Sequence, residues 1–290
     1  MTWSRPHFKP GGGNAFLFYA VLGDFPAEAP LMVPATYRSN GPPAGLSVTR
    51  LDAANHDHTR IVSDLRSGPL WSELEQRDPA LYAAASTAPS VLMLRGTITD
   101  PANLDYLGDT IGFVQYLLDH GGVAVLDSQI HKVWSQAAWR DEVFAAGEHS
   151  PQHHVVIVCT EAPGGLWFHT RGMRKFGRPD LSVHDTPLDK RDAVEDLLRR
   201  FIEVEALGHI IQPEQQIRVE ALPAGMSCHL CGGTDDPDFD NEHIEIKWPA
   251  DTPVAKRKTP VKPRAAKTPA KPKKPAESKP RPKAKAKPKP

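Results

Sequence analysis

The chain has 290 residues, of which 40% are hydrophobic, enough to bury a core in one large domain or two small ones. Its formal net charge of zero hides an uneven distribution: residues 255–290 contain 15 Lys or Arg and one Asp or Glu, which leaves 20 basic and 34 acidic residues in the rest. No apolar run reaches the roughly 20 residues that span a bilayer, and three cysteines are too few for a disulfide framework. These features argue against a membrane protein and a disulfide-rich one, and they favour a cytoplasmic location.

The first 90 residues show two strand patterns and one short helix pattern. Residues 15–22 and 46–51 have the apolar character of strands, and the loop between them is rich in Pro and Gly. Residues 71–76 predict a short helix. We expect residues 1–90 to form N-terminal strands and loops of the same globule as the core that follows.

Residues 91–250 are expected to form the core domain, because strand and helix patterns alternate there. A buried strand over residues 91–98 is followed by a helix that we expect to be capped at Asp100-Pro101 and to stop at Gly121-Gly122. One face of this helix carries Leu104, Leu107, Ile111, Val114 and Leu118, at spacings of three and four.

The segment after this helix predicts two strands with a helix between them. Residues 123–126 predict a strand, and Asp127 or Ser128 can cap a helix. That helix would bury Ile130, Val133, Trp134 and Ala137. Residues 154–159 have the composition of a central strand.

The last part of the core predicts one amphipathic helix and two strands. The helix begins after Thr186-Pro187, ends at Gly208 and buries Val194, Leu197, Leu198 and Phe201. Residues 217–222 and 243–248 predict the last strands. The whole pattern predicts an α+β fold, with one mixed sheet and helices packed on it.

The stretch LWFHTRGMRKFGRPDLSV, residues 166–183, is unusually basic and has two structural features that explain its glycines. Gly172 allows a strand to change into one helical turn, and Gly177 suits the left-handed residue that ends it. On this interpretation, which we favour, the basic side chains lie in solvent on the outside of the turn: Arg171, Arg174, Lys175 and Arg178.

The alternative interpretation of the same stretch is an anion-binding site. Guanidinium groups beside exposed backbone N–H groups suit a phosphate or carboxylate, and His169 adds a group that titrates near neutral pH. The candidate residues for such a site are His169, Arg171, Arg174, Lys175 and Arg178.

A motif within this stretch resembles the signature of an uncharacterised bacterial domain family, loosely grouped with toxin-immunity and suppressor-of-fused-like proteins. The family pattern is Thr-x-Gly-Leu/Met and then Phe-Gly-x-Pro-Asp/Glu-Ile/Leu, and here it is carried by Thr170, Gly172, Met173, Phe176, Gly177, Pro179, Asp180 and Leu181. The resemblance implies an α+β domain over about residues 91–248, and it supplies no catalytic residue. The paired cysteines and the basic tail depart from the family pattern.

The segment CHLCGG contains a cysteine pair, Cys228 and Cys231, with the spacing of half a zinc ribbon. Tetrahedral zinc needs two further ligands, for which His243 is the nearest candidate and Cys159 another. Zinc is thus the one cofactor that the sequence suggests. Two reduced thiols in a loop are the alternative, and we favour it because a second Cys-x-x-Cys is lacking.

An acidic loop follows the cysteines. Asp236, Asp238 and Asp240 have the spacing of a calcium loop, but the sixth position is Asn241 and the twelfth is Lys247, so we expect a solvated acidic loop.

Residues 251–290 form a Lys/Pro/Ala-rich segment that we expect to be a disordered basic tail. Lysines in an extended chain bind nucleic acid without sequence preference, by releasing counterions. The candidate nucleic-acid contacts are Lys256, Arg257, Lys258, Lys262, Arg264, Lys273 and Lys274. The acidic loop, residues 235–245, is a competing intramolecular partner for this tail, and a purely solubilising tail is the remaining alternative.

Two functions are compatible with these patterns. The first, which we favour, is a non-enzymatic, immunity-like interaction module that binds a protein partner and carries a tail for DNA, RNA or another polyanion. The second is an enzyme or zinc-dependent factor that uses His169 and residues 171–178 as an anion site.

Overall fold

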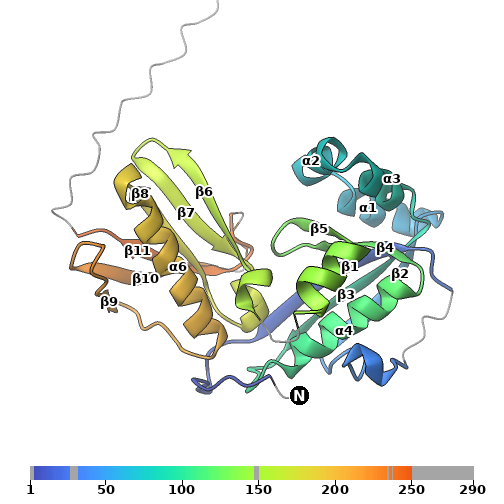
Figure 1. Cartoon of the computed structure of the whole chain (residues 1–290), viewed down its shortest axis with the longest axis horizontal. Helices are drawn as coiled ribbons and strands as arrows, with labels where there is room; N and C mark the ends of the chain where they lie inside the picture. Colours follow the sequence, from blue (N-terminus) through green and yellow to red (C-terminus); the bar gives the residue numbers. More distant parts are fainter. Residues whose placement is uncertain (1–2, 27–31, 147–149, 234, 237, 250–290) are drawn as a thin grey trace, which may run out of the picture. The chain divides into compact units, whose positions relative to one another are not determined.

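The computed structural model describes residues 3–26, 32–146, 150–233, 235–236 and 238–249. These residues contain both helices and strands, which confirms the α+β class. The strands divide between two sheets instead of forming one, and only the second sheet is mixed (Figure 1). The predicted tail, residues 251–290, lies outside the described residues.

The first sheet has five strands in the order β2-β3-β1-β4-β5, and each neighbouring pair is antiparallel. Its strands are β1 (Ala15–Gly23), β2 (Leu46–Asp52), β3 (Ser90–Ile98), β4 (Gly122–Asp127) and β5 (Lys132–Ser135). β1 pairs with β3 from Ala15↔Ile98 to Gly23↔Ser90. Of the strands from the first 90 residues, β1 therefore lies at the centre of this sheet and β2 at its edge, and later residues complete the sheet.

The second sheet has six strands in the order β6-β7-β8-β11-β10-β9. They are β6 (Val156–Ala162), β7 (Gly165–Arg171), β8 (Asp180–Thr186), β9 (Gln216–Ile217), β10 (Met226–Gly232) and β11 (Glu242–Lys247). β11 runs parallel to β8, and the other pairs are antiparallel. The prediction of a central strand at residues 154–159 is wrong, because β6 is an edge strand with half-buried and exposed side chains.

Helices cover both faces of the first sheet (Figure 1). One face packs on α1 (His56–Leu65), α2 (Pro69–Arg77) and α3 (Pro79–Thr87), and the other on α4 (Asp105–Asp119). All five apolar side chains that the sequence places on one face are buried, four of them on α4 and Leu104 at its N-cap. The helix begins at Asp105 and not at Asp100-Pro101. No helix of the described residues is long and apolar enough to cross a membrane.

The helix predicted after Asp127 is wrong, because β4 turns back at once as β5. Val133 packs in the cluster under α1–α3, whereas Trp134 packs in the cluster under α4. Adjacent residues that face opposite sides of a sheet are typical of a strand and not of a helix. The helical residues come later, in α5 (Gln136–Ala138) and a π-helical turn, Trp139–Phe144.

A single long helix, α6 (Arg191–Ala206), covers one face of the second sheet. It buries Val194, Leu197 and Leu198 as predicted, whereas Phe201 is only half-buried. Gly208 follows the helix with φ of 106°, the left-handed conformation expected there. Short 3₁₀ turns occupy Ala35–Tyr37, Pro151–His153, Met173–Phe176 and Leu188–Lys190.

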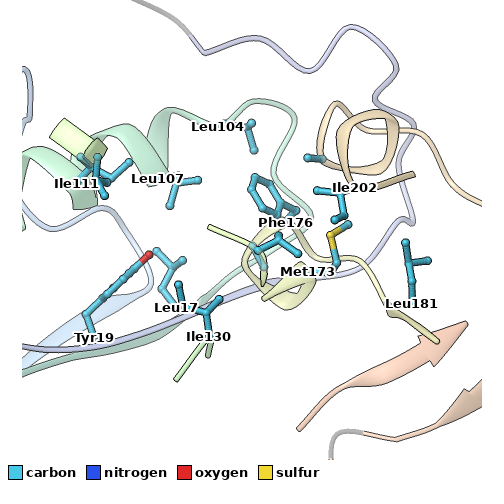
Figure 2. Packing of buried hydrophobic residues seen from close by; sticks show 14 of the residues in the cluster. Leu17, Tyr19, Leu104, Leu107, Ile111, Ile130, Met173, Phe176, Leu181 and Ile202 are labelled. Carbon is cyan, nitrogen blue, oxygen red and sulfur yellow. The ribbon is translucent and has the colours of Figure 1, made fainter. Parts of the chain in front are cut away.

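The 3₁₀ turn between β7 and β8 joins the cores of the two sheets. Met173 and Phe176 are both 0% exposed, and Figure 2 shows them between the Leu104 end of α4 and Ile202 of α6. Removing a buried aromatic side chain of this kind typically costs about 3–5 kcal/mol. The apolar residues of the basic stretch therefore hold the two halves of the fold together.

Candidate functional site

Residues 171–178, here called the basic turn, have the backbone that the glycines predict. Gly172 and Gly177 have φ of 113° and 65°, so both are left-handed, and the 3₁₀ turn lies between them. A Cβ on Gly177 would lie 2.5 Å from the carbonyl oxygen of Gly13, so the close approach of the N-terminal loop also requires glycine.

The prediction that the four cations of this turn lie in solvent is wrong. Lys175 is 0% exposed, and its Nζ lies 2.5 Å from Asp127 Oδ2 of β4 and 3.0 Å from the carbonyl oxygen of His154. Burial lowers the pKa of Lys175, and the Asp127 carboxylate opposes that shift. Lys175 therefore links the basic turn to the first sheet.

Arg178 is buried among backbone carbonyls, two of which belong to the loop that follows α6. Its guanidinium donates to the carbonyl oxygens of Gly12, Gly177, Gly208 and His209, over 2.7–2.9 Å. Arg5 donates to the carbonyl of Ala206 beside it, at 3.0 Å. The last carbonyls of a helix attract cations, so Arg5 stabilises the end of α6, whereas Arg178 fixes the loop that follows it.

Arg171 and Arg174 point toward the acidic loop, away from the acceptors of Lys175 and Arg178. Arg171 Nη2 lies 2.8 Å from Asp240 Oδ2, Arg171 Nη1 donates to the carbonyl of Asp238, and Arg174 Nη1 donates to the carbonyl of Asp240 at 2.8 Å. Both arginines line a hollow of about 320 Å³ with Arg95. The acidic loop is thus partly bound by this turn and is not simply solvated.

His169 lies apart from that hollow, on the outer face of β7. Its ring stacks on Trp167, with ring centroids 4.3 Å apart, and packs against the edge of Phe239. Burial, together with the charge of Arg171, lowers the pKa of His169 to about 4, so the ring is neutral at neutral pH. The five anion-site candidates therefore point in several directions and do not converge on one pocket.

Asp180, which the sequence analysis named in the motif but not as a site residue, is a buried carboxyl group that organises the end of the motif. Asp180 accepts hydrogen bonds from Thr170 Oγ1 (2.8 Å), Met173 N (3.2 Å) and Asn241 Nδ2 (2.8 Å). Burial raises the pKa of Asp180 to about 6, although these donors oppose the shift. Asp180 thus ties β7, the basic turn and the start of β11 together.

The cysteine pair is not a zinc knuckle in this fold. Cys228 and Cys231 lie on strand β10, where residues three apart face opposite sides of the sheet. Cys228 is 1% exposed, whereas Cys231 pairs in register with His243 of β11. Within the described residues no group of three or more His, Cys, Asp or Glu side chains is arranged to hold a metal ion.

The Cys228 thiol is also unsuited to nucleophilic chemistry. Burial, together with the nearby Glu205 carboxyl, raises its pKa to about 11, so the group is a neutral thiol at physiological pH. The third cysteine, Cys159, lies exposed on β6, on the other edge of the sheet from β10.

The feature with the clearest geometry of a binding site is a cavity of about 550 Å³ that the sequence analysis missed. Glu205 of α6, Cys228 of β10, Arg174 and Arg178 all contribute to its wall. Glu205 is 0% exposed, and neither of its carboxylate oxygens has a hydrogen-bond partner among the described residues. The sequence did contain a signal for the burial of Glu205, because this residue follows Leu198 and Ile202 at helical spacing on the inward face of α6.

The tail candidates between Lys256 and Lys274 lie outside the described residues. In comparisons with known proteins, no family model, no curated protein and no solved structure matches this chain. The resemblance of the motif to an uncharacterised bacterial family therefore remains a prediction.

Proposed function

We propose that this protein is a non-enzymatic interaction module whose folded part binds a protein partner and whose basic tail binds polyanions such as DNA or RNA. The observation that carries this proposal is the charge distribution, with 15 basic residues and one acidic residue in residues 255–290, against 20 basic and 34 acidic in residues 1–254. Such a segment binds phosphates through counterion release.

The basic turn supports assigning polyanion binding to the tail. Lys175 and Arg178 are buried and bound by internal acceptors, and Arg171 is paired with Asp240. A buried and paired cation has few donors left for an external phosphate. The folded part therefore lacks, in this turn, the exposed cationic surface that its sequence suggests.

Burial of charge does not change the acidic character of the folded part. Among the described residues the buried cations are Arg5, Arg171, Lys175 and Arg178, and the buried acids are Asp127, Asp180 and Glu205. Burial therefore removes nearly equal numbers of positive and negative side chains from the surface. An acidic body repels nucleic acid, which further favours the tail as the site of polyanion binding.

The edge strand β6 supports a protein partner. Among the described residues β6 pairs only with β7, so its other edge presents backbone N–H and C=O groups, and its first residues are Val156, Ile157 and Val158. An exposed apolar edge is a site where an extended segment of another protein adds a strand.

The tail is tested by a salt titration of binding to generic duplex DNA. We expect the full chain to bind with an affinity that falls steeply with salt, and a chain truncated after Pro253 to lose binding. The matched control is the full chain with Arg60→Gln, which removes one charge from the helical surface of α1. Undiminished binding by the truncated chain would contradict the proposal.

The acidic loop is tested with the double variant Asp235→Asn and Asp238→Asn, which spares the Arg171–Asp240 ion pair. If the loop competes for the tail, this variant of the full chain binds DNA more tightly, and the same change in the truncated chain has no effect. Equal affinity of the variant and the wild-type full chain would remove the competition from the proposal.

The protein partner is tested by capture with the truncated chain after nuclease treatment. Thr160→Lys places a charge on the β6 edge, which blocks strand addition. We expect a partner that the truncated wild-type chain retains and the Thr160→Lys chain loses, while Thr49→Lys on β2 of the first sheet keeps it. Retention by all three chains would argue against the β6 edge.

A further inference from the structure

The cavity beside Glu205 lies where segments from both halves of the fold meet. The N-terminal loop at Gly12, β1 at Phe16, the end of α6 at Glu205 and β10 at Cys228 all contribute to it. Its volume of about 550 Å³ is within the range of about 300–1,000 Å³ that is typical of small-molecule sites.

Glu205 is the polar group in this wall that most needs a partner. Buried polar atoms in folded proteins nearly always have a hydrogen-bond partner, whereas both oxygens of this carboxyl have none among the described residues. Burial raises the pKa of Glu205 well above its ordinary value, so the group is a neutral acid that can donate its proton to an acceptor. A buried carboxyl group without a partner destabilises the free protein, and a ligand that accepts its proton would supply the missing hydrogen bond.

The rest of the wall is mainly apolar. Ile210, Ile211, Pro213 and Ile244 line it, and so does Leu230, a large hydrophobic side chain that is 53% exposed. An exposed leucine at the edge of an apolar cavity is explained if a ligand with an apolar body covers it.

Besides Glu205, the wall carries two guanidinium groups, of Arg174 and Arg178, and one exposed carboxylate, of Glu242, so cations outnumber ionised acids there. Arg178 is held by backbone carbonyls and has no carboxylate within salt-bridge distance among the described residues. Arg174 lies over the Phe16 ring and is seen to donate one of its five N–H groups, to the carbonyl of Asp240. These cations disfavour an ammonium group and favour an anion.

We propose that this cavity binds a small monocarboxylic acid with an apolar body, whose carboxylate accepts a hydrogen bond from the Glu205 acid and is attracted by Arg174 and Arg178. The apolar body lies against the isoleucines and Leu230. This site belongs to the folded part alone and does not depend on what the tail or the edge of β6 binds.

The test uses three probes that share one apolar body: octanoate, octylamine and octan-1-ol. Binding to the full chain is measured by titration calorimetry at high ionic strength, so that the charges of the tail are screened. We expect octanoate to bind at least ten-fold more tightly than octylamine, with octan-1-ol between them. Tighter binding of octylamine, or no binding of octanoate at millimolar concentration, would overturn the proposal.

Three variants assign the contacts. Glu205→Gln keeps a donor of the same shape, so its affinity for octanoate should stay within about three-fold of the wild type. Glu205→Leu removes the donor and should weaken octanoate at least ten-fold while leaving octan-1-ol less affected. Arg174→Gln should weaken octanoate and leave octan-1-ol unchanged.

The Glu205→Leu variant also has a readout that shows whether it is folded. Replacing a buried acid without partners by an apolar side chain of similar size should raise its midpoint of urea unfolding above that of the wild type. A more stable Glu205→Leu protein that binds octanoate as tightly as the wild type would show that Glu205 does not contact the ligand, and the proposal would fail.

Discussion

The two sheets bury different kinds of residue. The first sheet lies between α1–α3 and α4 and is filled almost entirely by apolar side chains, with Asp127 as its buried acid at the end of β4. The second sheet and the turn that joins it to the first contain most of the buried charge, including Lys175, Arg178 and Glu205. The first sheet is therefore a scaffold, and the polar chemistry of the described residues gathers at the second sheet and the junction.

A basic stretch of sequence is therefore not by itself evidence for an anion-binding surface. In the basic turn each cation has an internal acceptor that is far away in the sequence, such as Asp127 for Lys175. These charges hold segments that are distant in the chain in one fixed arrangement, as buried ion pairs do in other proteins. Substitutions at these buried charges and at their exposed counterparts separate this structural role from a role at the surface.

Removing the buried ion pair should have the largest effect on stability. Lys175→Met leaves Asp127, whose side chain is 2% exposed, as an unpaired buried carboxylate, and we expect a loss of about 3–5 kcal/mol in the free energy of unfolding. The measurement is urea unfolding followed by tryptophan fluorescence.

The matched control is Lys132→Met on β5, which breaks an exposed ion pair with Glu142 and should cost less than about 1 kcal/mol. The double variant Lys175→Met with Asp127→Asn should recover most of the loss. A single Lys175→Met variant as stable as Lys132→Met would show that the turn does not depend on its cation.

The next largest effect concerns pH and His169. Its pKa of about 4 in the fold lies below the unfolded value of 6.5, so the unfolded chain binds the proton first as pH falls. Stability from this group is complete above pH 6.5 and is lost as pH falls to about 4, by at most about 3 kcal/mol.

Asp180, with a pKa of about 6, changes stability in the opposite direction over much of this window, because its ionisation destabilises the fold. The wild-type profile alone therefore hides both effects. The difference between wild type and His169→Gln isolates the histidine, and it should shrink from pH 7 to pH 4.5. His184→Gln, at an exposed ring, is the control, and a difference that does not vary with pH for His169→Gln would refute the assignment.

The Asp180 network should contribute an intermediate amount. Thr170→Val removes the donor to Asp180 Oδ1 and the acceptor for the backbone N–H of Leu181, both within a buried site. Asp180 Oδ1 keeps the donor Met173 N, but the buried N–H of Leu181 is left without an acceptor, and losing both hydrogen bonds costs about 2 kcal/mol. Thr49→Val, at an exposed position on β2 of the first sheet, should change the unfolding free energy by less than about 0.5 kcal/mol.

The sequence predicted well those elements whose residues repeat with one local period. The α4 and α6 faces and the glycine-bounded turn follow from spacing and from the conformational freedom of Gly177 and Gly208. Local pattern failed where partners lie far apart in the chain. The strand at residues 123–126 was predicted, but the segment of β5 was predicted as a helix because Val133 and Trp134 are both apolar. Both are buried because helices cover both faces of the sheet.

The candidate site shows the same limit more sharply. The burial of Lys175 and Arg178 could not be predicted, because their acceptors at Asp127 and Gly208 are 48 and 30 residues away in the chain. The cysteine spacing suggested a zinc knuckle because β10 was not predicted as a strand. In a strand, Cys228 and Cys231 face opposite sides of the sheet. The burial of Glu205 was predictable in principle, because its position in the helical repeat lies on the apolar face of α6. An acidic side chain on that face conflicts with the apolar pattern, and such conflicts mark functional sites.

The smallest effect should come from the hydrogen bond that joins α4 to the basic turn. Tyr106 Oη donates to the carbonyl of Lys175 at 2.6 Å within the buried junction, and burial raises the pKa of this phenol above its ordinary value. Tyr106→Phe should lower the unfolding free energy by about 1–2 kcal/mol, because the carbonyl loses its donor in a site closed to water. Tyr37→Phe removes an exposed hydrogen bond to Asp119 at 3.2 Å and should cost less than about 0.5 kcal/mol. Equal losses in the two variants would mean that the junction is open to water, and the division between an apolar scaffold and a buried polar junction would then have to be abandoned.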